Sequence, residues 1–300
     1  MTKDMTSGSP MKLILGFSVP LLFGFLFQQF YNLVDTLIVG RFLGVDALAA
    51  VGSTGSLNFL IIGFCMGVCN GFAIPLAHRF GAGDYKAMRA FMMNAVYLAV
   101  IFSAVMTVFT VAFCRPILQL MQTPENIIDD AYTYIVIIFA GIPATYLYNL
   151  VSGVIRSMGD SKTPLIFLAL AAFVNIGLDL LLIIVFPMGV AGAALATVIA
   201  QTLASAYCLW KLCRIEVLAE KRKAAKWRLH AGLCGKLIYL GLPMAFQNLV
   251  IAIGGMIVQT VVNSFGVAFI AGYTATCKLY GILEVAATSY GFAMVAYTGQ

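Results

Sequence analysis

Residues 28–44 read QQFYNLVDTLIVGRFLG and place a carboxylate inside an apolar segment that is long enough to span a membrane. Gln28, Tyr31, Asn32 and Asp35 lie at positions i, i+3, i+4 and i+7, so on an α-helix they share one face. A carboxylate within a membrane is costly unless it faces protein or a water-filled cavity. We therefore predict that Asp35 belongs to a functional site on a transmembrane helix.

The composition of the chain predicts an integral membrane protein. Of its 300 residues 62% are hydrophobic and 10% are charged, whereas about 25% of the residues in a soluble domain are charged. Apolar runs of about 20 residues recur without strand-type alternation, so the expected spanning elements are helices. The predicted fold class is all-α, a polytopic bundle of eight transmembrane helices that form a six-helix lobe and the first two helices of a second lobe.

Proline, glycine and charged residues divide the chain into eight apolar segments. These segments are residues 12–38, 47–77, 90–113, 127–151, 164–186, 190–210, 236–263 and 268–298. Between the fifth and the sixth segments only Pro187, Met188 and Gly189 remain. This spacing predicts a tight hairpin of antiparallel helices.

The distribution of Lys and Arg predicts the orientation of these segments. If the amino terminus is cytoplasmic, all of the 18 basic residues except Arg41, Arg115 and Lys278 fall in cytoplasmic segments. Basic residues gather on the cytoplasmic side of membrane proteins. We therefore expect a multi-pass protein with a cytoplasmic amino terminus. Contact with anionic membrane lipid explains the net charge of +6, so no nucleic-acid partner is expected.

A long basic stretch indicates how the chain is organised into domains. Residues 1–211 hold six spans and form the expected amino-terminal lobe. Residues 212–235 form a basic cytoplasmic linker, and residues 236–300 hold two further spans of an incomplete second lobe.

The last two spans resemble the first two. Gly44 follows Pro20 by 24 residues, and Gly266 follows Pro243 by 23. Since six spans return the chain to its starting side, both copies have the same orientation, as in transporters built from parallel repeats. A complete second copy needs about four more spans, so we expect the sequence to be part of a longer protein.

Polar residues also lie inside the fifth and sixth segments. Asn175 and Asp179 are spaced i, i+4 and share a helix face, and Thr197 lies beside a ridge of small residues. Counted from the outer helix ends, Asp35, Asp179 and Thr197 lie at one depth, roughly 10 Å inward at about 1.5 Å per residue. Their oxygens and the amide predict a site for a hard cation or for a proton. The alternative is that each acid only caps a helix end or bonds a neighbouring amide.

Four motifs in this order resemble a known family. They are VDTLIVGRFLGVDALAAVG at 34–52, Gly81-Ala82-Gly83-Asp84 with Arg89 behind it, IRSMGDSKTP at 155–164 and NIGLDLLLI at 175–183. Together they resemble the multidrug and toxic compound extrusion (MATE) family of efflux transporters, prokaryotic type. The resemblance covers essentially the whole chain. It implies two lobes of six helices, of which this chain would contain the first eight, and exchange of a drug for Na⁺ or H⁺.

The resemblance also implies which residues form the site. It assigns cation binding, with Na⁺ as one candidate ion, to Asp35, Asn175, Asp179 and Thr197. It assigns a surrounding polar or substrate-binding network to Gln28, Tyr31, Tyr134 and Asn149.

The second copy departs from the first in its charged residues. Met256 or Ile257 stands where the first copy has Asp35, so we expect ion binding only in the first lobe. Lys278 and Glu284 within the last span either line the cavity between the lobes or form an internal ion pair with a structural role.

We predict a cation-coupled antiporter, driven by Na⁺ or H⁺, that exports cationic or amphipathic drugs or metabolites by alternating access. We expect a monomer in the bacterial plasma membrane that uses no cofactor besides the coupling ion. One alternative is a lipid-linked oligosaccharide flippase of a related superfamily, which should have a cationic central cavity. A membrane-embedded enzyme is a further alternative, but it needs a nucleophile with a base or a metal-ligand cluster within the spans. The sequence offers neither, so we predict that the protein is not an enzyme.

Overall fold

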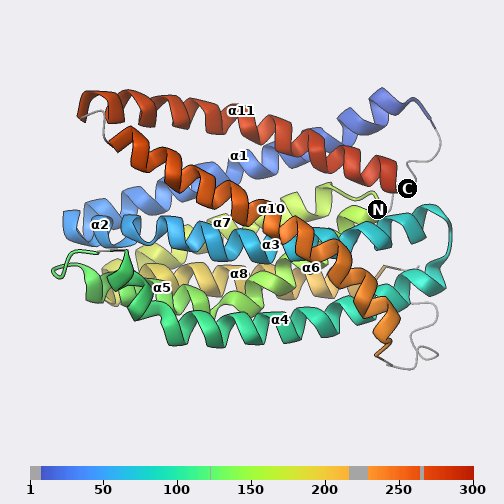
Figure 1. The fold of residues 1–300 in the computed structure, drawn as a ribbon, viewed down its shortest axis with the longest axis horizontal. Coiled ribbons are helices and arrows are strands. Elements are labelled where there is room, and N and C mark those ends of the chain that lie inside the picture. The colour runs from blue at the N-terminus through green and yellow to red at the C-terminus, as the bar shows by residue number, and fades with distance from the viewer. Residues whose placement is uncertain (1–7, 122, 216–228, 264–266) are drawn as a thin grey trace.

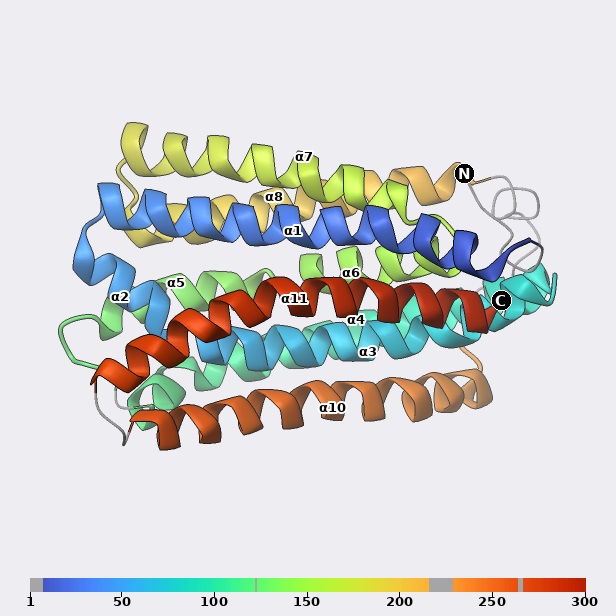
Figure 2. The same cartoon turned by 90° about the horizontal axis from the view of Figure 1, so that it is seen from above.

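The computed structural model describes residues 8–121, 123–215, 229–263 and 267–300 and consists of helices that run along one long axis (Figures 1 and 2). No strand occurs in these ranges, so the predicted all-α class is confirmed. The elements are α1 (Pro10–Phe42), α2 (Val45–Ser53), α3 (Gly55–Gly81), α4 (Tyr85–Leu120), α5 (Ile128–Ala140), α6 (Ile142–Ser157), α7 (Lys162–Leu180), the π-helical turn η1 (Leu181–Val185), α8 (Gly189–Cys213), α10 (Ala231–Asn263) and α11 (Val267–Gly299).

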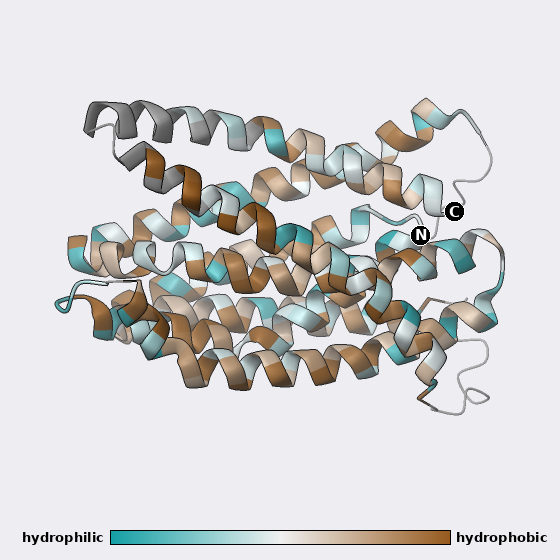
Figure 3. Cartoon of the chain, viewed as in Figure 1, coloured by the Kyte–Doolittle hydropathy of each residue, from teal (hydrophilic) through white to brown (hydrophobic). Residues whose placement is uncertain are grey.

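The helices are long and apolar enough for a polytopic membrane protein. Within the described residues six helical stretches pass this test, and the bent pair of α5 and α6 adds a seventh. The 33-residue helix α11 follows them. Each of the eight predicted segments coincides with one of these stretches. Figure 3 shows apolar residues along the helices and hydrophilic residues in the turns at the ends. The predicted helical bundle is confirmed.

Two predicted segments contain a break that the sequence analysis missed. The second is divided near Thr54 into α2 and α3, and the fourth bends by 45° between α5 and α6. Pro143 follows this bend, and a proline removes a helical N–H donor and clashes with the preceding turn. A Cβ at Gly141 would lie 2.6 Å from Cγ2 of Val198, so glycine allows α8 to approach the bend closely.

The predicted hairpin between the fifth and sixth spans is present. Helix α7 continues into η1, and α8 begins at Gly189 only four residues after η1 ends. The N–H of Met188 donates to the carbonyl oxygen of Leu182 at 3.0 Å. Gly189 has φ of +61°, a conformation that side chains with a Cβ rarely adopt. The short turn therefore depends on this glycine.

The beginning of α1 and the end of α11 lie at the same end of the bundle (Figures 1 and 2). We call this the inner end, because it is the end that the charge distribution predicts to face the cytoplasm. The outer end is the one that contains the hairpin between α7 and α8.

Helix α10 packs along α3 at very short range. A Cβ added to Gly71 would lie 2.5 Å from Cα of Gly241, and one added to Gly67 would lie 2.6 Å from Cα of Ala245. Nearer the outer end, Nδ2 of Asn248 donates to the carbonyl oxygen of Gly63 at 2.9 Å. We call the contact formed by Gly67, Gly71, Gly241 and Ala245 the glycine seam.

The start of α10 is also tied to α4. Oδ1 of Asn94, a buried residue of α4, accepts from the N–H of His230 at 2.9 Å and from Sγ of Cys234 at 3.3 Å. Of the predicted linker 212–235, residues 216–228 lie outside the described residues, as does Gly266 of the predicted repeat. The division into lobes therefore stays a prediction.

Candidate functional site

Two carboxyl groups face each other in the outer half of the bundle. Asp35 comes from α1 and Asp179 from α7, and their side chains lie within hydrogen-bonding reach of each other. Asp179 is fully buried and Asp35 is half-buried. In the described part of the chain, the Oδ1 atoms of both residues are buried without a hydrogen-bond partner. Such acceptors are costly to bury unless a proton or a cation satisfies them.

Asn175 and Thr197 complete this group from α7 and α8. With its nitrogen turned toward the acid, the Asn175 amide donates from Nδ2 to Oδ2 of Asp179 at 3.0 Å and accepts from the backbone N–H of Thr197 at 3.1 Å. In the opposite orientation Nδ2 lies 3.3 Å from Oγ1 of Thr197. We adopt the first orientation because it satisfies both neighbours. The structure thus brings together all four residues that the sequence analysis assigned to a cation site.

The local sequence explains how these side chains reach one level. Asn175 and Asp179 are one helical turn apart, so both point from α7 toward the same neighbours. Directly after Leu180, α7 widens into the π-helical turn η1. Such turns occur frequently at functional sites. On α8, a Cβ at Gly192 would lie 3.2 Å from the backbone of Leu182. Small residues on α8 therefore hold this helix close to the acid-bearing helix.

Two tyrosines enclose the acids. Tyr31, one turn before Asp35 on α1, lies within hydrogen-bonding reach of the Thr197 side chain. Tyr134 of α5 is buried and lies close enough to Tyr31 and both acids to interact with them electrostatically. These positions agree with a polar network around the site.

Two other predicted network residues are not brought to the acids by any described contact. Gln28 is half-buried on α1. The Asn149 amide donates from Nδ2 to the carbonyl oxygen of Thr145 at 2.8 Å, so it bonds its own helix.

The charged pair predicted in the last span is described only in part. Glu284 is exposed on α11, and the side chain of Lys278 lies outside the described residues. Their proposed contact therefore stays a prediction.

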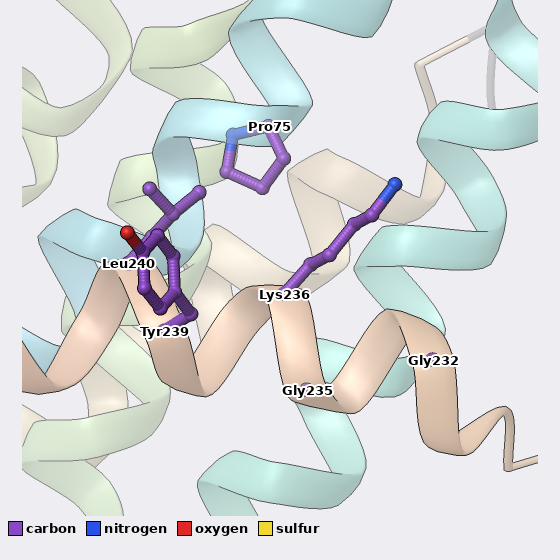
Figure 4. A pocket seen from close by; sticks show the side chains of 6 residues that line it. All are labelled: Pro75, Gly232, Gly235, Lys236, Tyr239 and Leu240. Atoms are coloured by element: carbon purple, nitrogen blue, oxygen red, sulfur yellow. The ribbon is translucent and has the colours of Figure 1, made fainter.

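A hollow beside the first turns of α10 lies apart from the acids. It has a volume of about 370 Å³ and is lined by Pro75 of α3 and, from the first turns of α10, by Gly232, Gly235, Lys236, Tyr239 and Leu240. Figure 4 shows the Lys236 side chain extending along it. The hollow offers no carboxylate and does not belong to the acid site.

The motif residue Asp160 has a structural role between α6 and α7. Its Oδ1 accepts from the N–H groups of Lys162 and Thr163 at 3.1 and 3.0 Å, and its Oδ2 accepts from the Thr163 hydroxyl at 2.6 Å. Burial alone would raise the pKa of Asp160, but the hydrogen bonds from Thr163 hold its pKa below the ordinary value. Asp160 therefore caps α7 in its charged form.

The acid site brings two facing carboxyls together with Thr197 and with the Asn175 amide, which turns its nitrogen toward Asp179. Two carboxylates, an amide and a hydroxyl suit a hard monovalent cation, and two facing carboxyls also suit a shared proton. The site lies inside membrane-spanning helices, where ionisable groups mark ion or proton pathways.

Comparison with known proteins identifies the family. A family model described as MatE matches residues 20–181, which is more than half of the chain and includes both acids. The chain belongs to the MatE family. Members of this family are transporters, which agrees with the prediction that the protein is not an enzyme.

Curated MatE relatives match nearly all of the chain. It is 33% identical over 298 residues to the probable multidrug resistance protein YpnP of Bacillus subtilis, covering 99% of this chain and 66% of that protein. It is 32% identical over 291 residues to the probable multidrug resistance protein YoeA of the same organism, covering 95% of this chain and 63% of that protein. The chain thus spans about two thirds of the length of these relatives.

A solved structure supports the fold. The outward-facing conformation of a multidrug resistance MATE family transporter matches with a TM-score of 0.87 at 23% identity. The match covers 99% of this chain and 66% of that chain.

Sequence reasoning missed the glycine seam, although its signal was present. Gly63, Gly67 and Gly71 recur every four residues, which is the small-residue spacing of closely packed transmembrane helices. On α10, Gly241 and Ala245 repeat the spacing. What the sequence did not indicate is that these two faces meet each other.

Proposed function

We propose that this MatE protein is a cation-coupled antiporter that exports drugs or metabolites by alternating access, with Na⁺ or H⁺ held by Asp35, Asn175, Asp179 and Thr197. The observation that carries this proposal is the facing pair of carboxyls with two buried, unpartnered Oδ1 atoms. A proton shared by the pair or a bound Na⁺ satisfies these atoms. An ion that leaves the site exposes two facing negative charges, so the empty site favours a different arrangement of α1 and α7.

Coupling follows if the ion and the substrate stabilise different conformations. A ligand shifts a conformational equilibrium only by its difference in affinity between the two states. Ion binding draws Asp35 on α1 toward Asp179 on α7, and substrate between the lobes favours the state in which these helices separate. The names of the Bacillus subtilis relatives support a small-molecule drug as the substrate.

Export assays in proteoliposomes test this proposal. The protein from its complete coding sequence is reconstituted, and ethidium transport is measured under imposed Na⁺ or H⁺ gradients. We expect Asp35→Asn and Asp179→Asn to lower gradient-driven transport roughly tenfold or more, within the usual range of coupling between sites. The gradient that drives the wild type identifies the ion.

Asp46→Asn is the matched control. Asp46 is an exposed acid on α2, close to the outer end of α1, and lies outside the acid site. Transport by this variant should equal that of the wild type. Undiminished transport by both site variants would refute the proposed ion site, and the two acids would then be structural.

A further inference from the structure

A small cavity lies toward the inner end, between the first six spans and the last two helices. Its volume is about 50 Å³. Its lining includes Asn70 and Ala73 of α3, Arg156 of α6, Met244 of α10 and Phe292 of α11. It is separate from the acid site, because it shares none of the residues of that site.

Phe292 joins α11 to two helices of the first six spans. Its ring stacks on Phe25 of α1 with 5.9 Å between centroids and 28° between planes. The guanidinium carbon of Arg156 lies 5.2 Å from the centroid of the Phe292 ring. One side chain of α11 therefore contacts both α1 and α6 at the wall of the cavity.

An apolar cluster closes the bundle beyond this contact. Ala293 and Ala296 of α11 pack against four buried residues of α1, which are Leu13, Ile14, Phe17 and Leu21. All of these α1 residues lie closer to the inner end than Phe25. On the inner side of the Phe292 contact, α11 therefore packs against α1, and Ala296 both belongs to this cluster and lines the cavity.

The charge on Arg156 makes the contact sensitive to water. Among the described residues no carboxylate forms an ion pair with Arg156. Besides the Phe292 ring, its electrostatic neighbours are Tyr148, Cys69 and Cys208. A guanidinium is stabilised either by an aromatic face or by hydration. Closure favours the ring, and an open, hydrated cavity favours water. Hydration of the cavity would therefore weaken the contact between Arg156 and Phe292.

We propose that Phe292 anchors the inner gate of the transporter: Phe25 and Arg156 hold α11 against α1 and α6 through Phe292, and movement of α11 away from these residues opens the cavity to the cytoplasm. This inference rests on the proposed alternating access and on the predicted orientation. It assigns to α11 a role that does not involve the acid site.

Thiol labelling of a cavity residue tests the gate. Ala73 lines the cavity, so Ala73→Cys is introduced into the complete protein as a reporter. In inside-out membrane vesicles, a membrane-impermeant maleimide should label this cysteine slowly. Phe292→Ala should raise the labelling rate about tenfold, because it removes the stacking and the cation–π contact together. Labelling of protein without the reporter gives the background from native cysteines.

Further variants separate a gate from a general packing effect. Phe292→Tyr keeps the ring and should label like the wild type, and Tyr290→Ala removes an exposed aromatic of the same helix and should also have no effect. Arg156→Met should raise the rate severalfold. The double variant should be labelled no faster than Phe292→Ala alone, because both substitutions remove the same contact between Arg156 and the Phe292 ring.

The outcomes distinguish the gate from the proposed transport function. A wild-type labelling rate in Phe292→Ala, or an equal rise in Tyr290→Ala, would overturn the gate. If Phe292→Ala fails to insert into the membrane, Phe292→Leu and Arg156→Met provide the same test. Labelling requires no transport, so the labelling experiment can refute the gate while ion-driven export persists. Equally, labelling can support the gate while the export assay refutes the proposed ion coupling.

Discussion

Asp35 and Asp179 show how the cost of a buried charge indicates a function. Each acid lies inside an apolar helix, and the structure brings both together with Asn175 and Thr197. One carboxylate alone could cap a helix or bond an amide. Two facing carboxylates with unpartnered buried oxygens need a proton or a cation, because repulsion and desolvation both oppose two negative charges at one point.

Asp160 is an acid with the opposite role, and its stability effect is testable. Its carboxylate caps α7 through two backbone N–H groups, so Asp160→Ala should lower the free energy of unfolding by about 1–2 kcal/mol at pH 7. Because folding lowers the pKa of Asp160, its carboxylate contributes fully to stability above the pKa of the unfolded chain, about 3.9. This stabilisation is lost as the pH falls through the pKa of Asp160 in the folded protein. Unfolding in detergent at pH 7 and below pH 3 measures both effects.

Glu125 provides the control for this measurement. It is exposed in the turn before α5, so Glu125→Ala should leave stability unchanged at both pH values. A difference between the wild type and Asp160→Ala that persists unchanged below pH 3 would contradict a role for the charged form of Asp160.

At the scale of helices, the glycine seam decides how closely α10 approaches α3. A Cβ at Gly71 would meet the backbone of Gly241, which cannot move aside as a side chain would. Helices in a membrane associate through such close packing because lipid is as apolar as their side chains. The seam and the contact between α1 and α11 together hold the last two helices against the first six spans.

Gly71→Ala tests the seam directly. The added methyl group should force α3 and α10 apart and lower stability by about 1–3 kcal/mol, the usual cost of overpacking. Gly63→Ala is the matched control on the same helix face, because its Cβ would lie 3.9 Å from Cβ of Asn248, an ordinary contact distance. Thermal unfolding in detergent compares the two variants. Equal stability of both would show that α3 and α10 can separate without cost.

At the scale of the whole molecule, the described residues form one bundle in which the beginning of α1 and the end of α11 lie at the inner end. The basic residues favour a cytoplasmic inner end, since Lys and Arg gather on the cytoplasmic side. Membership in the MatE family and the fold of a solved MATE transporter agree with this arrangement of spans.

Cysteine labelling in intact cells and inverted vesicles tests the orientation. Met188 is exposed in the turn between η1 and α8, and Ala82 is exposed in the turn after α3. An impermeant maleimide should label Met188→Cys in intact cells and Ala82→Cys in inverted vesicles, because the two turns lie at opposite ends of the bundle. The reverse pattern would invert the predicted orientation.

The sequence by itself determined the elements, because hydrophobic length and breaks at proline, glycine and charge are local properties. It also predicted the four residues of the candidate ion site, since an acid in an apolar helix is costly wherever that helix lies. It missed the bend at Gly141 and the π-helical turn after Asp179. Pro143 signals the bend in the sequence, whereas the close approach of α8 at Gly141 exists only in the packed bundle.

Only the tertiary structure decided which surfaces meet. The pairing of Gly71 with Gly241, and of Phe292 with Phe25 and Arg156, joins residues far apart in the chain. No periodicity within one helix encodes its partner, because every apolar face satisfies the membrane equally well. The choice follows from close packing and from a few polar and aromatic contacts, which exist only once the helices have assembled.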